Sequence, residues 1–536
     1  MKDRKKRLAR RRGAVGGQRD QERIAANLIR RLAEVFEREQ VDLEDIDRIA
    51  VRLEPLADEA VAVLERMLAS DDVYQQWQAV RVAAELCDDR LVEPLRRTLH
   101  DRHFPAWMRV LAVRALAQLA VLVDEATFFE SVLGPIALLS SGDAALQAGS
   151  DYFMLTLETL TWATLYEPGP LASYLRQRLV PRAERAMLPL LTALIYHPDD
   201  DVVMAAMEGL ERIKEPALLP LLEERARYDS SAEVRRAAEK AALRLGARTA
   251  GQPPQPWLTP PVLPLHACYL RAIDGDGGQM LMVARGTPST ALTSVNYIYN
   301  DHDGLIECIK LTLAERDLIE FFEGAGDMGY VQVPLATARS EVERALKCTL
   351  EAGQRPPPAF NLVRTWLDGD DPQQVEVVPL PALVPQDQPR LLGQSDRLLL
   401  LDEFDRWLFP QDMMEPHMPR YRRLERRDQL RPGHRLREML IDRVVTDLVA
   451  EDSPYRRLLP ERLRRQAWLL MQIYGENGAQ MALSALAAAA ALEQGIVREH
   501  PLLRAMAVES LDQAWSREEG EEEFWWDELD DEDEDE

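Results

Sequence analysis

The first half of the chain carries a helical repeat, and this repeat constrains the fold more than any other feature of the sequence. Residues 79–86 read Ala-Val-Arg-Val-Ala-Ala-Glu-Leu, and residues 112–119 read Ala-Val-Arg-Ala-Leu-Ala-Gln-Leu. Val202 and Val234 open two further helices at nearly the same separation. Both pairs are offset by about one repeat of the length that stacked helix pairs use, in which each pair buries its apolar face only against its neighbours.

Predicted helices follow one another from about residue 21 to residue 246. Short polar segments, such as residues 70–72, 197–201 and 229–231, separate these helices. The Asp and Ser residues in them suit N-cap positions, where a side-chain oxygen accepts a hydrogen bond from a free backbone N–H group. Between about residues 125 and 180 the pattern predicts longer, less regular helices.

The repeated segments resemble HEAT repeats, in which two antiparallel helices form each unit and the units stack into a solenoid. The second helix of such a repeat typically opens with Asp or Pro and continues as Val-Arg-x-x-Ala. This pattern is matched by residues 105–112, and by Asp229 followed by residues 234–238. The resemblance covers about residues 40–246, and it implies a helical fold whose exposed faces recognise partners.

Composition divides the remainder of the chain. The stretch from residue 246 to residue 264 contains six prolines, and residues 368–390 are rich in Pro, Asp and Gln. Both are predicted linkers. The predicted fold class is mainly α: a HEAT-like α-solenoid, a small α+β domain and a C-terminal helical region. The predicted segments are a disordered basic N-terminus (1–20), the helical repeat domain (21–246), a Pro-rich linker (247–264), the α+β domain (265–367), a second linker (368–390), the C-terminal helical domain (391–516) and a disordered acidic tail (517–536).

The α+β domain is predicted from a change of hydrophobic period. Residues 266–273, 279–285 and 292–300 read as strands, and the Asp-Gly-Asp-Gly-Gly run at 274–278 is a hairpin turn signal. These strands predict a three-stranded antiparallel meander. Helices are expected over about residues 305–323, 334–352 and 358–367.

Charge and cysteine usage bound the setting of the protein. The net charge of −26 argues against a molecule that coats nucleic acid or an anionic membrane. The four cysteines lie far apart without a CxxC motif, as in proteins of a reducing compartment. The longest apolar stretch, residues 481–492, is too short to span a bilayer, and no apolar run of signal-peptide length follows the basic N-terminus. The sequence therefore predicts a cytoplasmic protein.

One pattern suggests metal chemistry in the α+β domain. Three strands followed by a helix, with acidic residues at strand ends, resemble nucleases of the RNase H type, in which carboxylates hold two Mg²⁺ ions. The competing interpretation is that residues 274–278 form a turn and residues 300–303 cap a helix. The carboxylates in question are Asp274, Asp276, Asp301, Asp303 and Glu307.

No other motif indicates an active site. His100 and His103 form an H-x-x-H, but the nearest cysteine, Cys87, has no partner to complete a zinc site. Residues 275–278 are not followed by the Gly-Lys-Ser/Thr of a phosphate-binding loop. The sequence therefore assigns no catalytic residue, no cofactor, no cofactor-binding residue and no metal ligand, and a non-enzymatic role is favoured while the enzyme question stays open.

Two charged segments are the candidate partner-binding sites. Between residues 417 and 437 eight arginines stand against Glu425 and Asp428, which suits either phosphate or protein contacts, or a solvated or internally paired helix face. Residues 518–536 contain fourteen Asp and Glu residues around an aromatic triplet, which suits either docking into a basic groove or a plain solubilising tail. Opposite charge predicts a contact between the two segments. The candidate residues are Arg420, Arg422, Arg423, Arg426, Arg427, Phe524, Trp525 and Trp526.

These observations predict a non-enzymatic protein-interaction scaffold or adaptor built on a HEAT-like solenoid. Protein partners are expected, and a membrane is not. Two alternatives stay open. One is a nucleic-acid-binding or ribosome-associated factor that uses the arginine cluster, and the other is a metal-dependent hydrolase or nuclease seated in residues 265–367.

Overall fold

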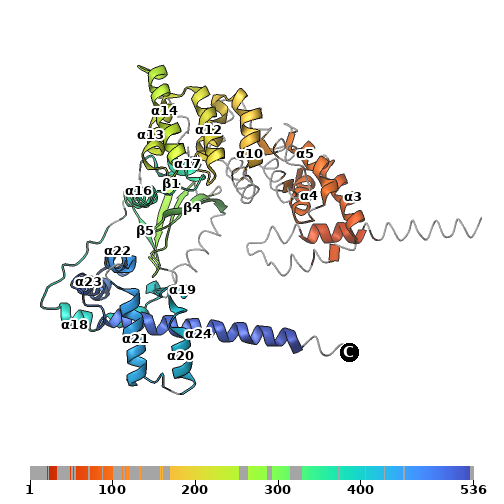
Figure 1. Cartoon of the computed structure of the whole chain (residues 1–536). Coiled ribbons are helices and arrows are strands. Elements are labelled where there is room, and N and C mark those ends of the chain that lie inside the picture. Colours follow the sequence, from red (N-terminus) through yellow and green to blue (C-terminus); the bar gives the residue numbers. More distant parts are fainter. Residues whose placement is uncertain are drawn as a thin grey trace, which may run out of the picture. The chain divides into compact units, whose positions relative to one another are not determined.

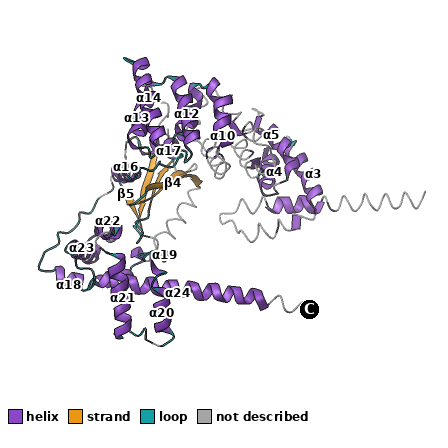
Figure 2. Ribbon diagram, in the orientation of Figure 1, coloured by secondary structure: helices purple, strands orange, loops and turns teal. Residues whose placement is uncertain are grey.

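The computed structural model describes most of the chain as two compact units. The described residues are 21, 23–32, 49, 52–53, 56–70, 73–86, 88–100, 169–252, 263–286, 292–313, 329–370, 375, 377–404, 406–427, 429–450 and 453–530, with single positions between 112 and 160. Unit 1 comprises Met1–Pro261 and Gly353–Asp368, and unit 2 comprises Val262–Ala352 and Gly369–Glu536. Helices predominate among the described residues (Figure 2).

The described part of unit 1 is helical, and its later helices stack in pairs (Figure 1). Helix α11 packs against α12, and α13 packs against α14. The second helices of these two pairs, α12 and α14, also contact each other. This is the arrangement that the sequence repeat predicts. The helices are α3 (Ala57–Leu68), α4 (Val73–Leu86), α5 (Val92–His100), α10 (Gly169–Tyr174), α11 (Leu188–Leu194), α12 (Asp200–Ile213), α13 (Leu219–Tyr228) and α14 (Ala232–Thr249).

Capping residues fix where α12 and α14 begin. Asp199 is the N-cap of α12 and accepts a hydrogen bond from the backbone N–H of Val202 at 3.1 Å. Ser231 is the N-cap of α14 and accepts one from Val234 at 3.4 Å. Val202 and Val234 therefore occupy the same position in their helices, and both are fully buried. The predicted equivalence of these two valines and the predicted caps before them are confirmed.

The Ala-Val-Arg repeat of the first helices is buried where the structure describes it. Ala79, Val80 and Ala83 in α4 are inaccessible to solvent, as are Ala112 and Ala115. Small side chains at these positions let neighbouring helices approach closely, which is why Ala rather than Leu recurs there. Most of residues 101–168 lie outside the described residues, so the irregular helices expected near 125–180 are tested only from Gly169 onward.

Unit 2 contains a five-stranded antiparallel sheet in the order β4-β3-β2-β1-β5, where the sequence predicted three strands. Helix α16 (Leu335–Glu351) packs against this sheet and contacts β1, β3 and β4 (Figure 2). The predicted hairpin at residues 274–278 is present, with Gly277 at φ +84°. The strands are β1 (Leu265–Arg271), β2 (Gln279–Arg285), β3 (Leu292–Asn300), β4 (Gly304–Leu313) and β5 (Tyr330–Val333).

The prediction of a helix from residue 305 is wrong, because β4 occupies Gly304–Leu313. The predicted helix cap at residues 300–303 is instead a turn between β3 and β4. In this turn the Asn300 side chain accepts a hydrogen bond from the backbone N–H of Asp303 at 2.6 Å. Gly304 follows at φ +78°, which glycine adopts readily. The β-branched residues after it favour a strand once β3 offers a pairing edge. Residues 314–323 lie outside the described residues.

The boundary predicted at residue 367 also differs from the structure. Residues 353–368 belong to unit 1, where α17 (Phe360–Val363) contacts α11. The helix expected over residues 358–367 is therefore one short α-helical turn followed by a tighter turn, Arg364–Leu367, and it packs on the repeat helices. Asn361, which is fully buried, donates a hydrogen bond to the carbonyl oxygen of Thr192 at 2.5 Å.

The C-terminal helices share a single core with the turn region of the sheet. This core contains Ile273 at the end of β1 together with Phe404, Trp407 and residues of the later helices. The indole N–H of Trp407 donates to the carbonyl oxygen of Ile273 at 2.8 Å. Residues 265–352 and the C-terminal helices therefore form one unit rather than two domains. The helices are α18 (Gln388–Leu392), α19 (Gln411–Met414), α20 (Met418–Glu425), α21 (Arg435–Leu448), α22 (Pro454–Tyr474), α23 (Ala479–Glu493) and α24 (Pro501–Asp530).

Helix α24 continues through most of the segment that the sequence assigned to a disordered tail. It begins at Pro501 and ends at Asp530, well beyond residue 516, where the sequence predicted that the helical region ends (Figure 1). Residues 501–516 anchor it, since Leu502, Leu503, Met506 and Leu511 are buried in the core. Glu is a good helix former, so the helix can propagate from this anchored part into the acidic sequence.

Candidate functional site

The repeat helices of unit 1 present a charged groove of about 380 Å³. It is lined by Val180, by the last turn of α12 and by the end of α14. Lys214, which follows α12, takes the left-handed conformation at φ +58° and so turns the chain away from the helix axis. The lining residues are Val180, Glu208, Glu211, Arg212, Lys214 and Arg248.

Ion pairs leave this groove with an excess of positive charge. Arg176 approaches Glu208 at 3.4 Å, and Arg244 approaches Glu211 at 3.2 Å. Both acidic residues of the groove therefore have basic partners outside it. Within the part of the chain that the structure describes, Lys214 and Arg248 have no acidic partner. The groove is thus a locally basic surface on a protein whose net charge is −26.

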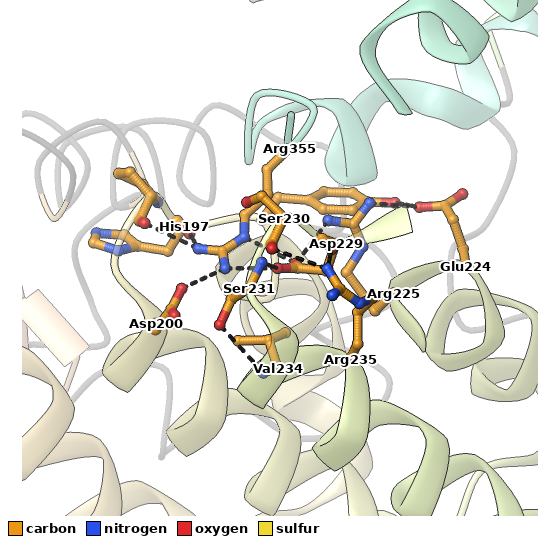
Figure 3. Close-up of polar contacts among 12 residues, drawn as sticks. His197, Asp200, Glu224, Arg225, Asp229, Ser230, Ser231, Val234, Arg235 and Arg355 are labelled. Atoms are coloured by element: carbon orange, nitrogen blue, oxygen red, sulfur yellow. Dashed lines mark hydrogen bonds and ion pairs between the residues drawn. The ribbon is translucent and has the colours of Figure 1, made fainter. Parts of the chain in front are cut away.

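A buried polar network ties the loops before α12 and α14 to the returning segment 353–368 (Figure 3). Arg355 donates to both carboxylate oxygens of Asp229 at 3.0 Å and to Asp200 at 2.5 Å. It also donates to the carbonyl oxygens of His197 at 2.7 Å and Pro198 at 2.9 Å. Asp229 is inaccessible to solvent, and Arg355 is 8% exposed. Arg225 adds a third cationic contact to Asp229 at 3.2 Å.

The same network contains a buried histidine that stays neutral. Burial lowers the pKa of His197 to about 4, because the charged imidazolium loses its hydration. The ring is therefore neutral near pH 7, and its Nδ1 accepts a hydrogen bond from the backbone N–H of Asp199 at 3.1 Å. Arg225 Nε lacks a hydrogen-bond partner, but its guanidinium lies over the Tyr196 ring at 4.6 Å. These contacts hold the repeat together, and none of them presents a reactive group to solvent.

The predicted arginine cluster lies on α20 and the loop that leads to α21. Met418, Tyr421 and Leu424 point into the core of unit 2, so the arginines between them are turned outward. Arg420 is partly buried. Four of the candidate arginines are exposed: Arg422, Arg423, Arg426 and Arg427.

A groove of about 550 Å³ runs between α20 and α21 beside these arginines. His417 and Arg420 line one wall, and Leu440 and Leu448 contribute apolar surface on the other. Burial lowers the pKa of His417, so its ring is neutral near pH 7. The remaining lining residues are Met413, Pro416, Arg443, Asp447 and Ser453.

The aromatic triplet of the tail lies on α24. The backbone of Phe524, Trp525 and Trp526 is helical, and their side chains are outside the described part of the structure. Closer to the core, Asp512 of the same helix accepts a hydrogen bond from the Tyr421 hydroxyl at 2.5 Å, and Trp515 packs near the Tyr421 ring. Helix α24 therefore crosses α20 at residues 512–515.

The acidic residues considered as metal ligands have protein partners instead. Arg462, which is 1% exposed, binds both carboxylate oxygens of Asp301 at 2.7 Å. The Tyr455 hydroxyl donates to Asp276 at 2.8 Å, and Asp274 accepts from the backbone N–H of Gly278 at 2.6 Å. Burial raises the pKa of Asp274, and the neighbouring Asp276 charge adds to this effect. Asp303 accepts a hydrogen bond from the Asn300 amide at 3.1 Å, and Glu307 is exposed on β4.

The structure gives no support to the other chemical candidates. Among the described residues, no group of three or more His, Cys, Asp or Glu side chains is placed to hold a metal ion. His103 lies outside the described residues, and only the backbone of His100 is described. Residues 275–278 form the β1–β2 turn rather than the start of a helix. Cys268, Cys308 and Cys348 are free thiols. No described helix combines the length and the apolar character needed to cross a membrane.

Several residues that shape these sites carried no recognisable signal in the sequence. Arg355 and Arg462 reach carboxylates that are 126 and 161 residues away in sequence. Arg443 and Leu440 enter the α20–α21 groove only because the two helices lie side by side. Arg225 and Asp229 are the exception, since their i, i+4 spacing on a predicted helix marks an ion pair.

Comparison with known proteins supports the helical repeat. No curated protein matches the chain. Residues 177–242 match the family model for HEAT repeats. This segment contains the α11–α12 pair, the α13 helix, most of α14 and the α12 part of the charged groove. The paired helices and the match together identify residues 177–242 as HEAT repeats.

Proposed function

We propose that the protein is a non-enzymatic scaffold that binds protein partners through the surface of its HEAT repeats. HEAT repeats in general mediate protein interactions, because stacked helices offer an extended surface whose side chains set specificity. The observation that carries the proposal is the groove of about 380 Å³ on residues 177–242 and α14, with its excess of positive charge. Its chemistry fits an acidic segment of a partner protein.

The α12–α14 geometry supports this choice over a purely structural role for the repeat. The side chains that hold α12 and α14 together are apolar and buried, such as Val202 and Val234. Arg212, Lys214 and Arg248 contribute nothing to that core. They lie at one edge of the two helices, where they can be replaced without disturbing the packing.

A charge-reversal experiment tests the proposal. The full chain is used to recover partners from extracts of the native host, and the partners are quantified by mass spectrometry. We expect the variant Arg212→Glu, Lys214→Glu, Arg248→Glu to lose specific partners by about tenfold or more, because three favourable charges become unfavourable. The matched control, Arg390→Glu, Arg397→Glu, Arg457→Glu, changes three exposed arginines of unit 2 by the same total charge. Recovery of the same partners in the same amounts with both variants would reject the proposal.

The nuclease alternative has no comparable support. Asp301 is already neutralised by Arg462, and Asp276 is hydrogen-bonded to Tyr455. A divalent ion would have to displace a bidentate, nearly inaccessible arginine before Asp301 became a ligand.

A further inference from the structure

We propose that the groove between α20 and α21 is a docking site for the acidic C-terminal segment, residues 517–536, of a second copy of this chain. The site is separate from the HEAT groove and does not depend on the function proposed above. The argument uses the arginines along α20, the apolar floor of the groove and the position of α24.

The arginines form a stripe that continues the groove along α20. Arg420, Arg423 and Arg427 recur at i, i+3 and i+7, so their side chains follow one edge of the helix and its first turn beyond. Arg420 lines the groove itself, and Arg423 and Arg427 are exposed. None of the three has an ion-pair partner within the part of the chain that the structure describes. Cations left unpaired in this way on an acidic protein favour an anionic ligand.

The groove also offers apolar surface for an aromatic ring. Leu440 and Leu448 are buried beside Met413, and the neutral ring of His417 lies on the opposite wall. Its volume of about 550 Å³ exceeds the roughly 150 Å³ at which an engineered apolar cavity holds benzene. Asp447 in the groove is paired with Arg443 at 3.0 Å, so its charge is partly offset and does not repel an acidic ligand as strongly as a free carboxylate.

The C-terminal segment has the complementary chemistry. Fourteen of residues 518–536 are Asp or Glu, and Phe524, Trp525 and Trp526 are adjacent among them. Adjacent large aromatic rings in an acidic segment lose free energy when they are exposed to water, and a half-apolar groove removes that loss. Acidic residues on either side would then face Arg423 and Arg427. The pairing follows the docking mode in which an amphipathic helix lays anchor residues into a groove.

The path of α24 favours a second copy over the same chain as the source of this segment. Asp512 and Trp515 hold α24 against Tyr421 of α20. Because the helix continues to Asp530, Trp525 lies about 15 Å farther along the axis than Trp515, at 1.5 Å per residue. A straight helix thus carries the aromatic triplet away from its own crossing with α20. Two copies that exchange their tails would each fill the other's groove in a closed, two-fold arrangement.

A complementation experiment with the full chain tests the proposal. The groove variant is Arg420→Glu, Arg423→Glu, Arg427→Glu, and the tail variant is Trp525→Ala, Trp526→Ala. Self-association is measured by analytical ultracentrifugation at low and at physiological salt. We expect a salt-sensitive dimer for the natural sequence and a dimer dissociation constant raised about tenfold or more in either variant. The control Arg390→Glu, Arg397→Glu, Arg457→Glu carries the same added charge and should dimerise as the natural sequence does.

Mixing the two variants separates exchange between copies from a contact within one chain. A labelled tail variant, with its intact groove, should bind the groove variant, with its intact tail, and form a heterodimer with one functional site. A natural protein that stays monomeric at all concentrations, or a mixture that forms no heterodimer, would overturn the proposal. So would a monomer that binds single-stranded polyuridylate through Arg420, Arg423 and Arg427, because the stripe would then be a nucleic-acid site.

Discussion

Replacing Arg355 with alanine is expected to destabilise unit 1 by about 3 kcal/mol, because it breaks a buried charge pair while leaving the carboxylate in place. Arg355 makes five hydrogen bonds to the loops before α12 and α14, and its side chain is 8% exposed (Figure 3). Asp229 would lose two of its charge-assisted contacts in a site that water does not reach.

The magnitude lies near the lower end of what such losses usually cause, about 3–5 kcal/mol, for a structural reason. Asp229 keeps the Arg225 guanidinium at 3.2 Å and the Ser231 backbone N–H at 2.9 Å, so its charge stays partly compensated. Asp200 is half exposed and can be hydrated when Arg355 is removed. The substitution should therefore weaken the repeat without unfolding it.

Native-state hydrogen exchange followed by mass spectrometry measures this effect within the full chain. Peptides that cover α12 and residues 353–368 report on unit 1, and peptides from α22 in unit 2 serve as the internal reference. Arg355→Lys keeps the charge but cannot match the forked geometry, so it should fall between the alanine variant and the natural protein. The exposed Arg390→Ala is the matched control. The reasoning is refuted if Arg355→Ala changes the opening free energy in α12 by less than about 0.5 kcal/mol.

Three further predictions follow from individual contacts. Burial lowers the pKa of His197 to about 4, so the folded state resists protonation that the unfolded chain undergoes near pH 6.5; stability is complete above pH 6.5 and should decline by about 3 kcal/mol as the pH falls toward 4, a dependence that His197→Asn should remove in urea titrations of unit 1. Arg462→Met should destabilise unit 2 by about 3 kcal/mol because Asp301 is left buried and unpaired, and adding Asp301→Asn should recover most of that loss in hydrogen exchange of α22. Gly304→Ala should lower the thermal midpoint of unit 2 far more than Gly433→Ala, since both glycines have φ near +78° but only at Gly304 would a Cβ meet backbone and side-chain atoms of α16.

Local patterns in the sequence predicted the repeat well because each signal lies within a few residues of what it specifies. The spacing from Val202 to Val234 reflects one helix pair, and Asp199 and Ser231 cap helices that begin directly after them. The Asp-Gly-Asp-Gly-Gly run fixed the β1–β2 hairpin in the same way. The arginine-rich stretch was recognised as a surface feature from composition alone, and its exposed residues lie on α20 and the following loop.

Errors arose where the outcome depended on distant partners. Residues 305–313 contain apolar residues compatible with either helix or strand, and β3 decided between the two by offering a pairing edge. The acidic residues of the middle segment suggested a metal site because nothing in the local sequence shows that Arg462 neutralises Asp301. The boundary at residue 367 differed because Arg355 and Asn361 bind backbone groups of the repeat that lie far earlier in the chain, at His197 and Thr192.

The amino-acid sequence by itself determined the helix pairs, their caps, the basic stretch and the acidic end, since periodicity, capping and charge are properties of short segments. Only the tertiary structure decided which carboxylates are paired with arginines, which strand completes the sheet and which two helices enclose the α20–α21 groove. These outcomes depend on groups that are distant in sequence and meet only in the folded chain, and the free energy that selects them comes from burial and charge pairing there.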